Sequence, residues 1–166
     1  MKRLVLVGGG HAHLHILKSL AAKRWPGVEV ILIAPYSRQI YSGMVPGWIA
    51  GHYSIDQCAA ELGPLADAAG ARIIKDSASG LDASRQEIHC LRSGSTRYDV
   101  LSLDIGALVD HSCLAASGAS LLPIRPLESF VVGWTRQLEQ FRQHGQACLV
   151  VVGGGYIGLE FAQAYR

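Results

Sequence analysis

The spacing of apolar residues at the start of the chain predicts a strand, a helix and a second strand. Residues 3–7 (RLVLV) form a short apolar run that ends at glycines, and residues 11–24 carry apolar side chains at helical spacing. Pro26 and Gly27 end this helix, and the run VEVILIA (28–34) predicts a second buried strand. A strand, helix and strand of this length form a right-handed crossover between parallel strands. The opening therefore predicts an α/β fold with a parallel sheet.

The pattern becomes irregular in the next part of the chain. Residues 35–53 (PYSRQIYSGMVPGWIAGHY) show no clean period and are rich in glycine, proline and aromatic residues, which predicts a long apolar loop. Residues 54–62 begin with a capping-box pattern of serine and glutamine and predict a short helix. Residues 64–70 run from a proline to a glycine and predict another. We expect two short helices after the loop.

The second half of the chain returns to clear periods. Residues 71–104 contain strand-like runs separated by turn residues, which predict a small antiparallel meander that leads into a final buried strand. Residues 127–143 place their apolar side chains on one helical face. Residues 146–166 (QACLVVVGGGYIGLEFAQAYR) then repeat the opening, with an apolar strand at 147–152, three glycines and a helix at 155–166. Such a repeat implies two nucleotide sites or one duplicated fold.

Composition narrows the class of protein. The chain of 166 residues is 49% hydrophobic and 17% charged, which is typical of a globular domain rich in buried parallel sheet. Its 15 basic and 13 acidic residues are scattered, so no basic patch indicates nucleic-acid binding. The apolar runs are far shorter than the ~18 residues of a membrane span, and no signal-peptide pattern is present. We expect a cytoplasmic protein without a transmembrane segment, with peripheral contact to a membrane left open.

Cysteine spacing bears on redox chemistry. The four cysteines are Cys58, Cys90, Cys113 and Cys148. No C-x-x-C pair and no zinc-type cluster of cysteine and histidine occurs among them. The spacing therefore favours separate reduced thiols over a redox-active dithiol.

The second glycine turn has the complete pattern of a dinucleotide site. Gly153, Gly155 and Gly158 satisfy G-x-G-x-x-G between a predicted strand and a predicted helix. In this pattern the first glycine permits a tight turn, the second lets the backbone approach a pyrophosphate, and the third lets helix and strand pack closely. The anion then lies on free amides at the helix N-terminus. This context favours nucleotide binding over a turn that binds nothing.

The first turn departs from the pattern at one position. Gly8 and Gly10 fit, but His13 stands where the third glycine belongs. His13 shares the stripe that faces the sheet, so either the helix stands further from the strand or His13 forms a hydrogen bond inward. His11 and His15 could face one way, but His13 points ~200° around the helix and no acidic residue completes a metal site. We predict a phosphate cradle without a metal, in which His11 could donate to a phosphate oxygen.

The end of the second strand lacks a common feature of dinucleotide folds. An acidic residue usually stands there to hold the ribose hydroxyls, whereas Ala34 and Pro35 occupy the place here. Ser37 or Arg38 could hold the ribose or adenine instead, or both could be ordinary loop residues.

These motifs resemble the pyridine nucleotide-disulfide oxidoreductase superfamily, the flavoproteins that bind two dinucleotides. Residues 4–18 (LVLVGGGHAHLHILK), 41–54 (YSGMVPGWIAGHYS) and 98–107 (YDVLSLDIGA) are most similar to the NADH-dehydrogenase-like subgroup associated with selenide, water dikinase. Residues 151–162 (VVGGGYIGLEFA) are similar to the NAD(P)H-binding turn of the disulfide reductases. The resemblance implies a Rossmann-like FAD/NAD(P)-binding fold of class α/β, with a parallel sheet and a small antiparallel β-meander. It also implies a functional link to selenide, water dikinase.

The resemblance implies a domain organisation and a set of site residues. It places the first part of an FAD-binding domain in 1–120, a connecting loop and helix in 121–145, and the start of an NAD(P)H-binding domain in 146–166, as in the N-terminal portion of a longer protein. The residues expected to bind FAD are Gly8, Gly9, Gly10, His11, Ala12, Ser37, Arg38, Ser42, Gly43, Asp104 and Gly106. Those expected to bind NAD(P)H are Gly153, Gly155, Tyr156, Gly158 and Glu160. In the family pattern Tyr156 covers the flavin and Glu160 lies beside the nicotinamide, although ordinary surface roles for both stay open.

The implied activity is hydride transfer from NAD(P)H to FAD and onward transfer to a small-molecule acceptor. Without a dithiol pair, disulfide reduction is excluded for these residues and a quinone is one candidate acceptor. No catalytic acid or base is assigned. Two alternatives are a dehydrogenase that uses nicotinamide alone and a non-catalytic nucleotide-binding or interaction module. The last strand and helix cannot bury their apolar faces alone, so we expect them to dock on the first domain or to pair with a second copy in a homodimer or swapped dimer.

Overall fold

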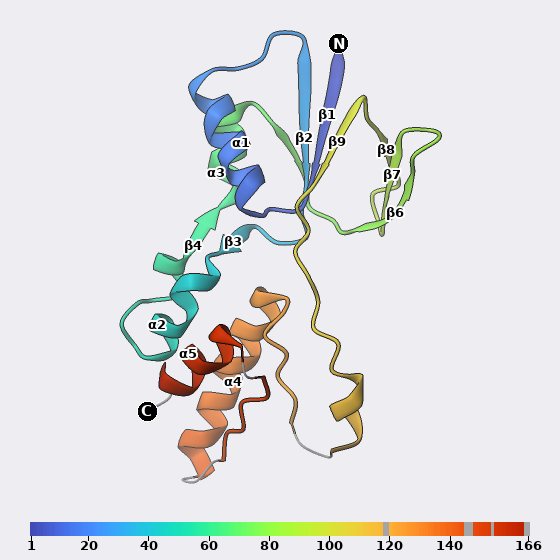
Figure 1. Ribbon diagram of the computed structural model, residues 1–166. Coiled ribbons are helices and arrows are strands. Elements are labelled where there is room, and N and C mark those ends of the chain that lie inside the picture. The colour runs from blue at the N-terminus through green and yellow to red at the C-terminus, as the bar shows by residue number, and fades with distance from the viewer. Residues whose placement is uncertain (118–119, 145–147, 154, 165–166) are drawn as a thin grey trace. The chain divides into compact units, whose positions relative to one another are not determined.

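The protein forms two compact units in a computed structural model (Figure 1). The structure describes residues 1–117, 120–144, 148–153 and 155–164. Unit 1 comprises Met1–Gln39 and Ala60–Gly106, and unit 2 comprises Ile40–Ala59 and Ala107–Arg166. Each unit therefore combines segments that are distant in the sequence.

Unit 1 is built on a four-stranded sheet. Its strands are β1 (Lys2–Val7), β2 (Val28–Ile33), β5 (Arg72–Ile74) and β9 (Val100–Leu103). Their order is β5-β2-β1-β9, and every pair is parallel. The helix α1 (His11–Ala22) connects β1 to β2. The strands and the helix predicted from apolar spacing in the opening segment are confirmed.

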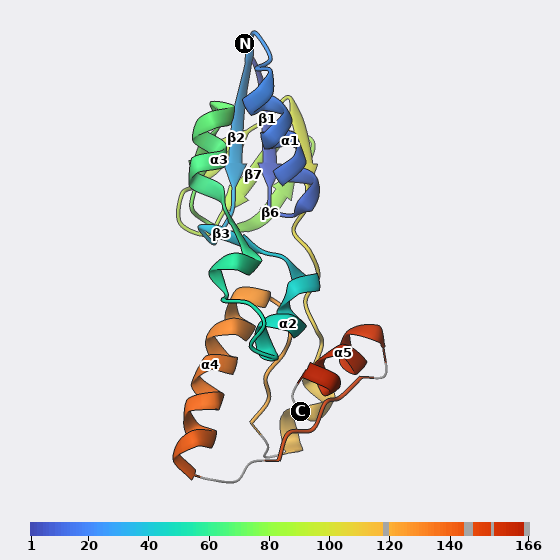
Figure 2. The ribbon, with the colours of Figure 1, turned by 90° about the vertical axis from the view of Figure 1, so that its left-hand side faces the viewer.

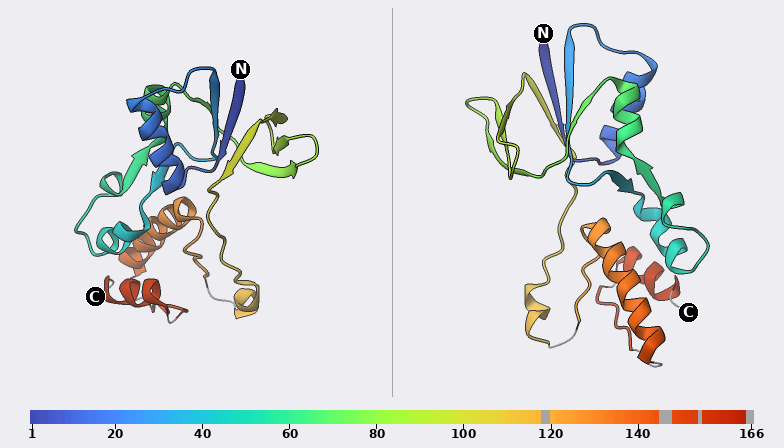
Figure 3. Two further views of the ribbon diagram at one scale, coloured as in Figure 1. Left: turned by 45° about the horizontal axis from the view of Figure 1, so that its top comes forward. Right: turned by 180° about the vertical axis from the view of Figure 1, so that it is seen from behind.

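Helices cover one face of this sheet and a small antiparallel sheet covers the other (Figure 1). The helices are α1 and α3 (Leu62–Ala69), which lie side by side when unit 1 is viewed from the helix side in Figure 2. The antiparallel sheet of β6 (Ala78–Asp82), β7 (Glu87–Cys90) and β8 (Ser95–Arg97) confirms the predicted meander over these residues, whereas residues 72–74 of the predicted region join the parallel sheet as β5. Figure 3 shows these layers from two further directions.

The alternation of side chains along β1 explains the two apolar layers. Leu4 and Leu6 pack with the residues of α1 and α3, whereas Val5 and Val7 pack with the meander. Successive side chains of a strand point to opposite faces of the sheet. Because both faces of this sheet are buried, the sequence of β1 is apolar without interruption in its buried part. A parallel sheet with both faces covered is the consequence.

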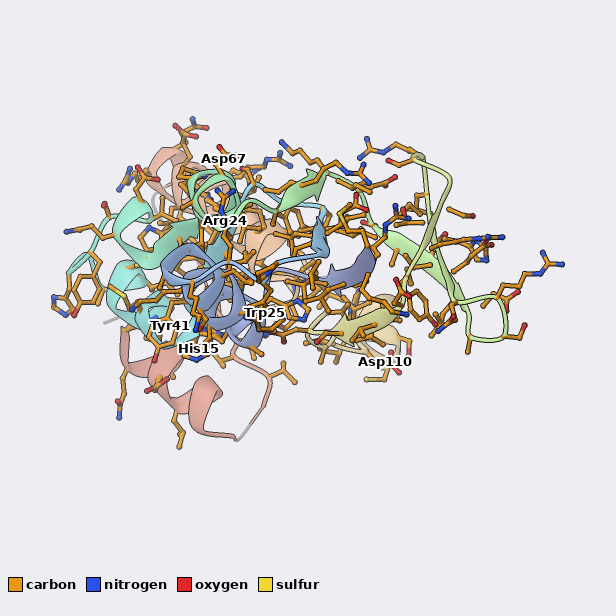
Figure 4. The ribbon with its side chains drawn as sticks, turned by 90° about the horizontal axis from the view of Figure 1, so that it is seen from above. His15, Arg24, Trp25, Tyr41, Asp67 and Asp110 are labelled. Carbon is orange, nitrogen blue, oxygen red and sulfur yellow. The ribbon has the colours of Figure 1, made fainter. Side chains whose placement is uncertain are left out.

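Helix α3 ends at the glycine that its sequence predicts and begins at Leu62, two residues before the predicted start. Pro64 stands in its first turn, and Gly70 ends it with a φ of +66° in the left-handed region. The guanidinium group of Arg24, which is labelled in Figure 4, lies against Gly70. A cation near the last turn of a helix interacts favourably with its dipole. This contact helps to hold the end of α3 against the segment after α1.

The helix predicted over residues 54–62 is wrong beyond its first turn. The capping contacts form, with the Ser54 amide donating to the Gln57 side chain at 2.9 Å, but only the short 3₁₀ helix η2 (Asp56–Cys58) follows. The chain then extends as β4 (Ala59–Glu61), which pairs with β3 (Arg38–Ile40). Next to this pair, the Tyr41 amide donates to the Cys58 carbonyl at 2.7 Å. Backbone groups that a longer helix would need are therefore bonded to the neighbouring segment instead.

Unit 2 is mainly helical. It contains the short 3₁₀ helices η1 (Ser42–Met44) and η3 (Ser112–Ser117) and the helices α2 (Val45–Ile49), α4 (Leu127–His144) and α5 (Tyr156–Ala164). Its apolar core is formed by Ile40, Val45, Leu127, Phe130, Val131 and Trp134. The helix predicted over residues 127–143 is confirmed by α4.

The strand predicted over residues 147–152 is wrong for the part that the structure describes. Residues 148–152 form no strand, and Val150 and Val152 are exposed. A β-strand needs a neighbouring strand for its backbone hydrogen bonds, and none pairs with this segment among the described residues. Helix α5 packs on α2, which corresponds to the docking alternative, with Phe161 at the edge of the unit 2 core. None of the described helices is both long and apolar enough to span a lipid bilayer.

Candidate functional site

The first glycine turn links the end of β1 to the start of α1. Gly8 has a φ of +94°, and its amide donates to the Ile33 carbonyl at 2.8 Å. A Cβ atom at Gly8 would overlap the backbone carbonyl of Asp104. Only glycine satisfies both the left-handed backbone and this close approach. The turn is therefore tight because β9 ends directly against it.

The two following glycines expose peptide amides at the start of α1. Gly10 is the N-cap residue and has no side chain to cap the helix. Among the described residues, the amides of Gly9 and Gly10 donate no hydrogen bond. Such amides at a helix N-terminus attract an anion, because the helix dipole adds positive potential there. His11 and Ala12 are exposed in the same first turn. The residues of the predicted cradle, Gly8, Gly9 and Gly10, thus lie where β1 leads into α1.

The carboxylate of Asp104, the residue after β9, lies at this helix end. The backbone amide of Asp104 donates to the Val7 carbonyl at 2.8 Å, which fixes the residue beside the turn. Its Oδ2 atom accepts from the Ala12 amide at 2.9 Å and from the His13 amide at 3.4 Å. A Cβ atom at Gly10 would overlap the same carboxyl group. The predicted site residue Asp104 thus meets the turn through its charged side chain.

His13 stands where the dinucleotide pattern has its third glycine. Its buried side chain forms two hydrogen bonds. Its side chain is fully buried between α1 and the sheet. The Nδ1 atom lies 2.7 Å from the Gly8 carbonyl, which can only accept, so Nδ1 carries the proton. In the neutral ring Nε2 then accepts from the Ser102 hydroxyl at 2.9 Å. The inward hydrogen bond predicted for His13 is confirmed.

The other residues predicted to bind FAD lie in several segments. In unit 1, Ser37 is exposed, and its carbonyl accepts from the Leu62 amide at 2.8 Å. Arg38, also in unit 1, is half-buried at the start of β3. Gly106 is exposed after β9, with a φ of +71°. Ser42 and Gly43 belong to η1 in unit 2.

The second glycine turn shows two backbone features of its pattern, although residues 148–152 before it form no strand. Gly153 has a φ of +133°, and a Cβ atom at Gly158 would overlap the carbonyl of Gly153. The Leu159 amide donates to the Gly155 carbonyl at 3.2 Å in the first turn of α5. Glu160 is half-buried on α5. Tyr156 begins this helix, but its side chain lies outside the described part of the structure.

The cysteines show no arrangement for dithiol chemistry among the described residues. Cys58 in unit 2 and Cys90 in unit 1 are buried free thiols, and Cys113 and Cys148 are exposed free thiols. Burial raises the pKa of the Cys58 thiol. Burial and the charge of Asp76 raise the pKa of the Cys90 thiol. A raised pKa lowers the fraction of nucleophilic thiolate, so neither buried thiol is activated.

The first turn fits the diphosphate of a dinucleotide in its backbone but not in its charge. The positive φ at Gly8, the bare amides of Gly9 and Gly10 and the start of α1 form the geometry that holds a diphosphate. The carboxylate of Asp104 supplies a like charge at the same helix end.

Comparisons with known proteins identify a matching family and a curated relative. A family model described as pyridine nucleotide-disulphide oxidoreductase matches residues 2–166. A dihydrolipoyl dehydrogenase of Pseudomonas aeruginosa is 33% identical over 113 residues, which are 68% of this chain and 22% of that protein. Solved structures with a similar fold include complexes with NADH.

Two solved structures have the same fold. NDH2 from Plasmodium falciparum in complex with NADH matches with a TM-score of 0.76 and 13% identity over 99% of this chain and 36% of that chain. The sulfide:quinone oxidoreductase from Aquifex aeolicus matches with a TM-score of 0.65 and 17% identity over 87% of this chain and 33% of that chain. This chain thus spans about a third of either structure. The predicted Rossmann-like α/β fold is confirmed.

Proposed function

Because this chain belongs to the pyridine nucleotide-disulphide oxidoreductase family, we propose that it forms the FAD-binding part of an oxidoreductase that oxidises NAD(P)H. FAD, when bound, supplies the chemistry of accepting a hydride from NAD(P)H and of passing electrons to an acceptor. The observation that carries the proposal is the family match over residues 2–166, together with the bare amides at the start of α1. The protein's own part is to bind and orient the two cofactors.

In this proposal the first turn binds the FAD diphosphate. The amides of Gly9 and Gly10 donate to phosphate oxygens, and His11 and Ala12 present the first turn of α1 to the same anion. Ser37 and Arg38 follow β2, where the ribose of a dinucleotide lies in this fold, and they contact the ribose or adenine. The remaining FAD contacts in the proposal are Ser42, Gly43 and Gly106, and Asp104 lies beside the diphosphate at the start of α1.

The second turn binds NAD(P)H. Gly153, Gly155 and Gly158 supply the tight turn and the start of α5, and the close approach of Gly158 to the Gly153 carbonyl supports this assignment. Tyr156 covers the flavin until nicotinamide arrives, and Glu160 lies beside the nicotinamide. These two roles come from the resemblance to the disulfide reductases.

The acceptor that we propose is a quinone. The 166 residues hold no C-x-x-C pair, and their two buried thiols have raised pKa values, which argues against electron transfer through a dithiol. Among proteins of the same fold, the one from A. aeolicus has a quinone in its name. A link to selenide, water dikinase, a cytoplasmic location and a homodimer or swapped dimer stay predictions of the sequence.

The test is the flavin content of the purified protein, followed by anaerobic titration with NADH and NADPH. We expect FAD to be released on denaturation and the flavin absorbance to bleach on addition of a reduced nicotinamide. Subsequent addition of a soluble quinone should restore the absorbance. Oxidation of NAD(P)H without any bound flavin would favour the nicotinamide-only dehydrogenase. FAD or ADP binding without NAD(P)H oxidation would favour the non-catalytic module.

A further inference from the structure

Two anions compete for the start of α1, and one of them is part of the protein. We propose that the carboxylate of Asp104 is an internal competitor of the FAD diphosphate and thereby sets how tightly this protein holds FAD. This inference rests on the proposed function and adds a residue that determines affinity.

The contacts of Asp104 place its charge where a diphosphate binds. Its Oδ2 atom accepts from the Ala12 amide at 2.9 Å and from the His13 amide at 3.4 Å, so two amides of the first turn are already in use. The overlap of a Gly10 Cβ atom with this carboxyl group shows that it lies directly over the N-cap. The hydrogen bond from the Asp104 amide to the Val7 carbonyl holds the residue there.

Helix α1 has no capping group of its own. Its N-cap is Gly10, which has no side chain, and its first turn contains no acidic residue. A carboxylate at a helix N-terminus satisfies orphan amides and interacts favourably with the dipole. Asp104 therefore stabilises the start of α1 from a position 92 residues away in sequence.

The same contact opposes the cofactor. The bare amides of Gly9 and Gly10 remain for the diphosphate, but the carboxylate lies beside them and repels it. Binding then requires Asp104 to turn away from Ala12 and His13 or to remain as a like charge at close range. Either outcome lowers the affinity for FAD relative to the same turn with a neutral side chain.

The inference predicts that loss of the Asp104 charge changes the affinity for the diphosphate and the stability of the fold in opposite directions. Removing the charge at residue 104 should strengthen binding of the diphosphate and weaken the fold without cofactor. A purely structural role of Asp104 would weaken both, and a role as a favourable FAD ligand would weaken binding. The opposite signs identify competition.

The experiment compares the D104N and D104E variants with the wild type by isothermal titration of the flavin-stripped protein. D104N keeps the size and a hydrogen-bond acceptor but loses the charge, whereas D104E keeps the charge. The control is D99N, since Asp99 lies just before β9 at its other end and bonds to Lys2 and the Arg3 amide. FAD, ADP and inorganic pyrophosphate are the probes, and circular dichroism verifies the fold of each variant.

We expect D104N to bind each probe roughly tenfold more tightly than the wild type, with D104E and D99N close to the wild type. We also expect the melting temperature of flavin-free D104N to fall by about 2–4 °C. Equal or weaker binding of all three probes by D104N would overturn the inference while leaving FAD binding by the wild type intact. If neither protein binds FAD but D104N gains pyrophosphate binding, the inference stands and the proposed function fails.

Discussion

The Nε2 atom of His13 lies 2.9 Å from the hydroxyl oxygen of Ser102, and this contact links α1 to β9 beside the first glycine turn. The other ring nitrogen donates to the Gly8 carbonyl at 2.7 Å. A glycine at residue 13 would allow helix and strand to pack closely with no polar group between them. Here a buried ring with both nitrogens bonded fills that space, so the turn is fixed by hydrogen bonds instead.

The first prediction concerns the stability that this ring provides. His13→Ala should lower the free energy of unfolding by about 2–4 kcal/mol, because it leaves a cavity and removes partners from the Gly8 carbonyl and the Ser102 hydroxyl. His15→Ala is the matched control, since His15 is exposed on the same helix and should change stability by less than about 0.5 kcal/mol. Urea denaturation followed by circular dichroism measures both. Equal effects of the two substitutions would contradict the assignment.

The pairing of His13 with Ser102 can be tested separately. The loss in the His13→Ala, Ser102→Ala double variant should be smaller than the sum of the two single losses by about 1 kcal/mol, because both single changes remove the same hydrogen bond. Additive losses would show that the two side chains do not interact.

The second prediction separates backbone strain from steric overlap at the first turn. Gly8 and Gly27 both have positive φ, but a Cβ atom at Gly8 would overlap the Asp104 carbonyl, whereas nothing lies within 4 Å of one at Gly27. Gly27→Ala should therefore cost only about 1 kcal/mol of unfolding free energy. Gly8→Ala should cost about 1–3 kcal/mol more, because the end of β9 must also move. Similar urea midpoints for the two variants would show that the close approach of β9 has no energetic consequence.

The third prediction follows from the hydrogen bonds of Asp76. Burial opposes its charge, but the Ser93 hydroxyl and the amides of Arg92, Ser77 and Ser93 donate to the carboxylate and hold its pKa well below the usual range. Because the Asp76 carboxyl has a lower pKa in the folded state than its value of about 4 in the unfolded state, its charge stabilises the fold above about pH 4. This stabilisation is lost as the pH falls below that value toward the folded-state pKa.

Asp76→Asn should therefore lower stability at neutral pH and flatten the loss of stability between about pH 4 and pH 2. Urea midpoints across this range measure the slope for the wild type and the variant. Asp67→Asn serves as the control because Asp67 is exposed on α3. An unchanged acid slope in the Asp76 variant would mean that the hydrogen bonds do not hold the carboxylate ionised.

The elements of unit 1 could be predicted from sequence because their signals are local. The apolar run of residues 3–7, the helical stripe that contains His13 and the proline and glycine that bound α3 each specify a backbone conformation within a few residues. The contact of the Asp104 carboxylate with the Ala12 amide spans 92 residues, and nothing in the spacing of either segment encodes it. The pattern of residues 98–107 indicated a cofactor contact at Asp104 but not where its side chain would point.

The two wrong elements share a physical cause. Residues 59–61 form β4 and not helix because β3 offers backbone partners. Residues 148–152 have a strong strand pattern and form no strand because no neighbour pairs with them among the described residues. Strand formation depends on a partner that the local sequence does not contain, whereas a helix satisfies its own backbone. Both errors therefore arise where strand formation depends on a partner segment.

The last prediction concerns α5, whose nine residues are too few to form a stable helix alone. Its helical state depends on packing within unit 2, where the ring of Phe161 meets that of Phe130 edge-on, with 5.4 Å between centroids. Such an aromatic pair adds about 1 kcal/mol beyond the apolar area that it buries. Phe161→Ala should therefore shift α5 toward its undocked state.

Limited proteolysis measures this shift, because a protease cuts a helix only when the helix opens. Cleavage within residues 148–164 should become roughly tenfold faster in Phe161→Ala, since tenfold corresponds to about 1.4 kcal/mol. Leu159→Ala is the matched control on the same helix, because Leu159 is largely exposed and its loss removes little packing. Equal cleavage of both variants and the wild type would mean that α5 is held by something other than the Phe161 contact. Faster cleavage of the Phe161 variant alone would identify this ring as the anchor of the last helix.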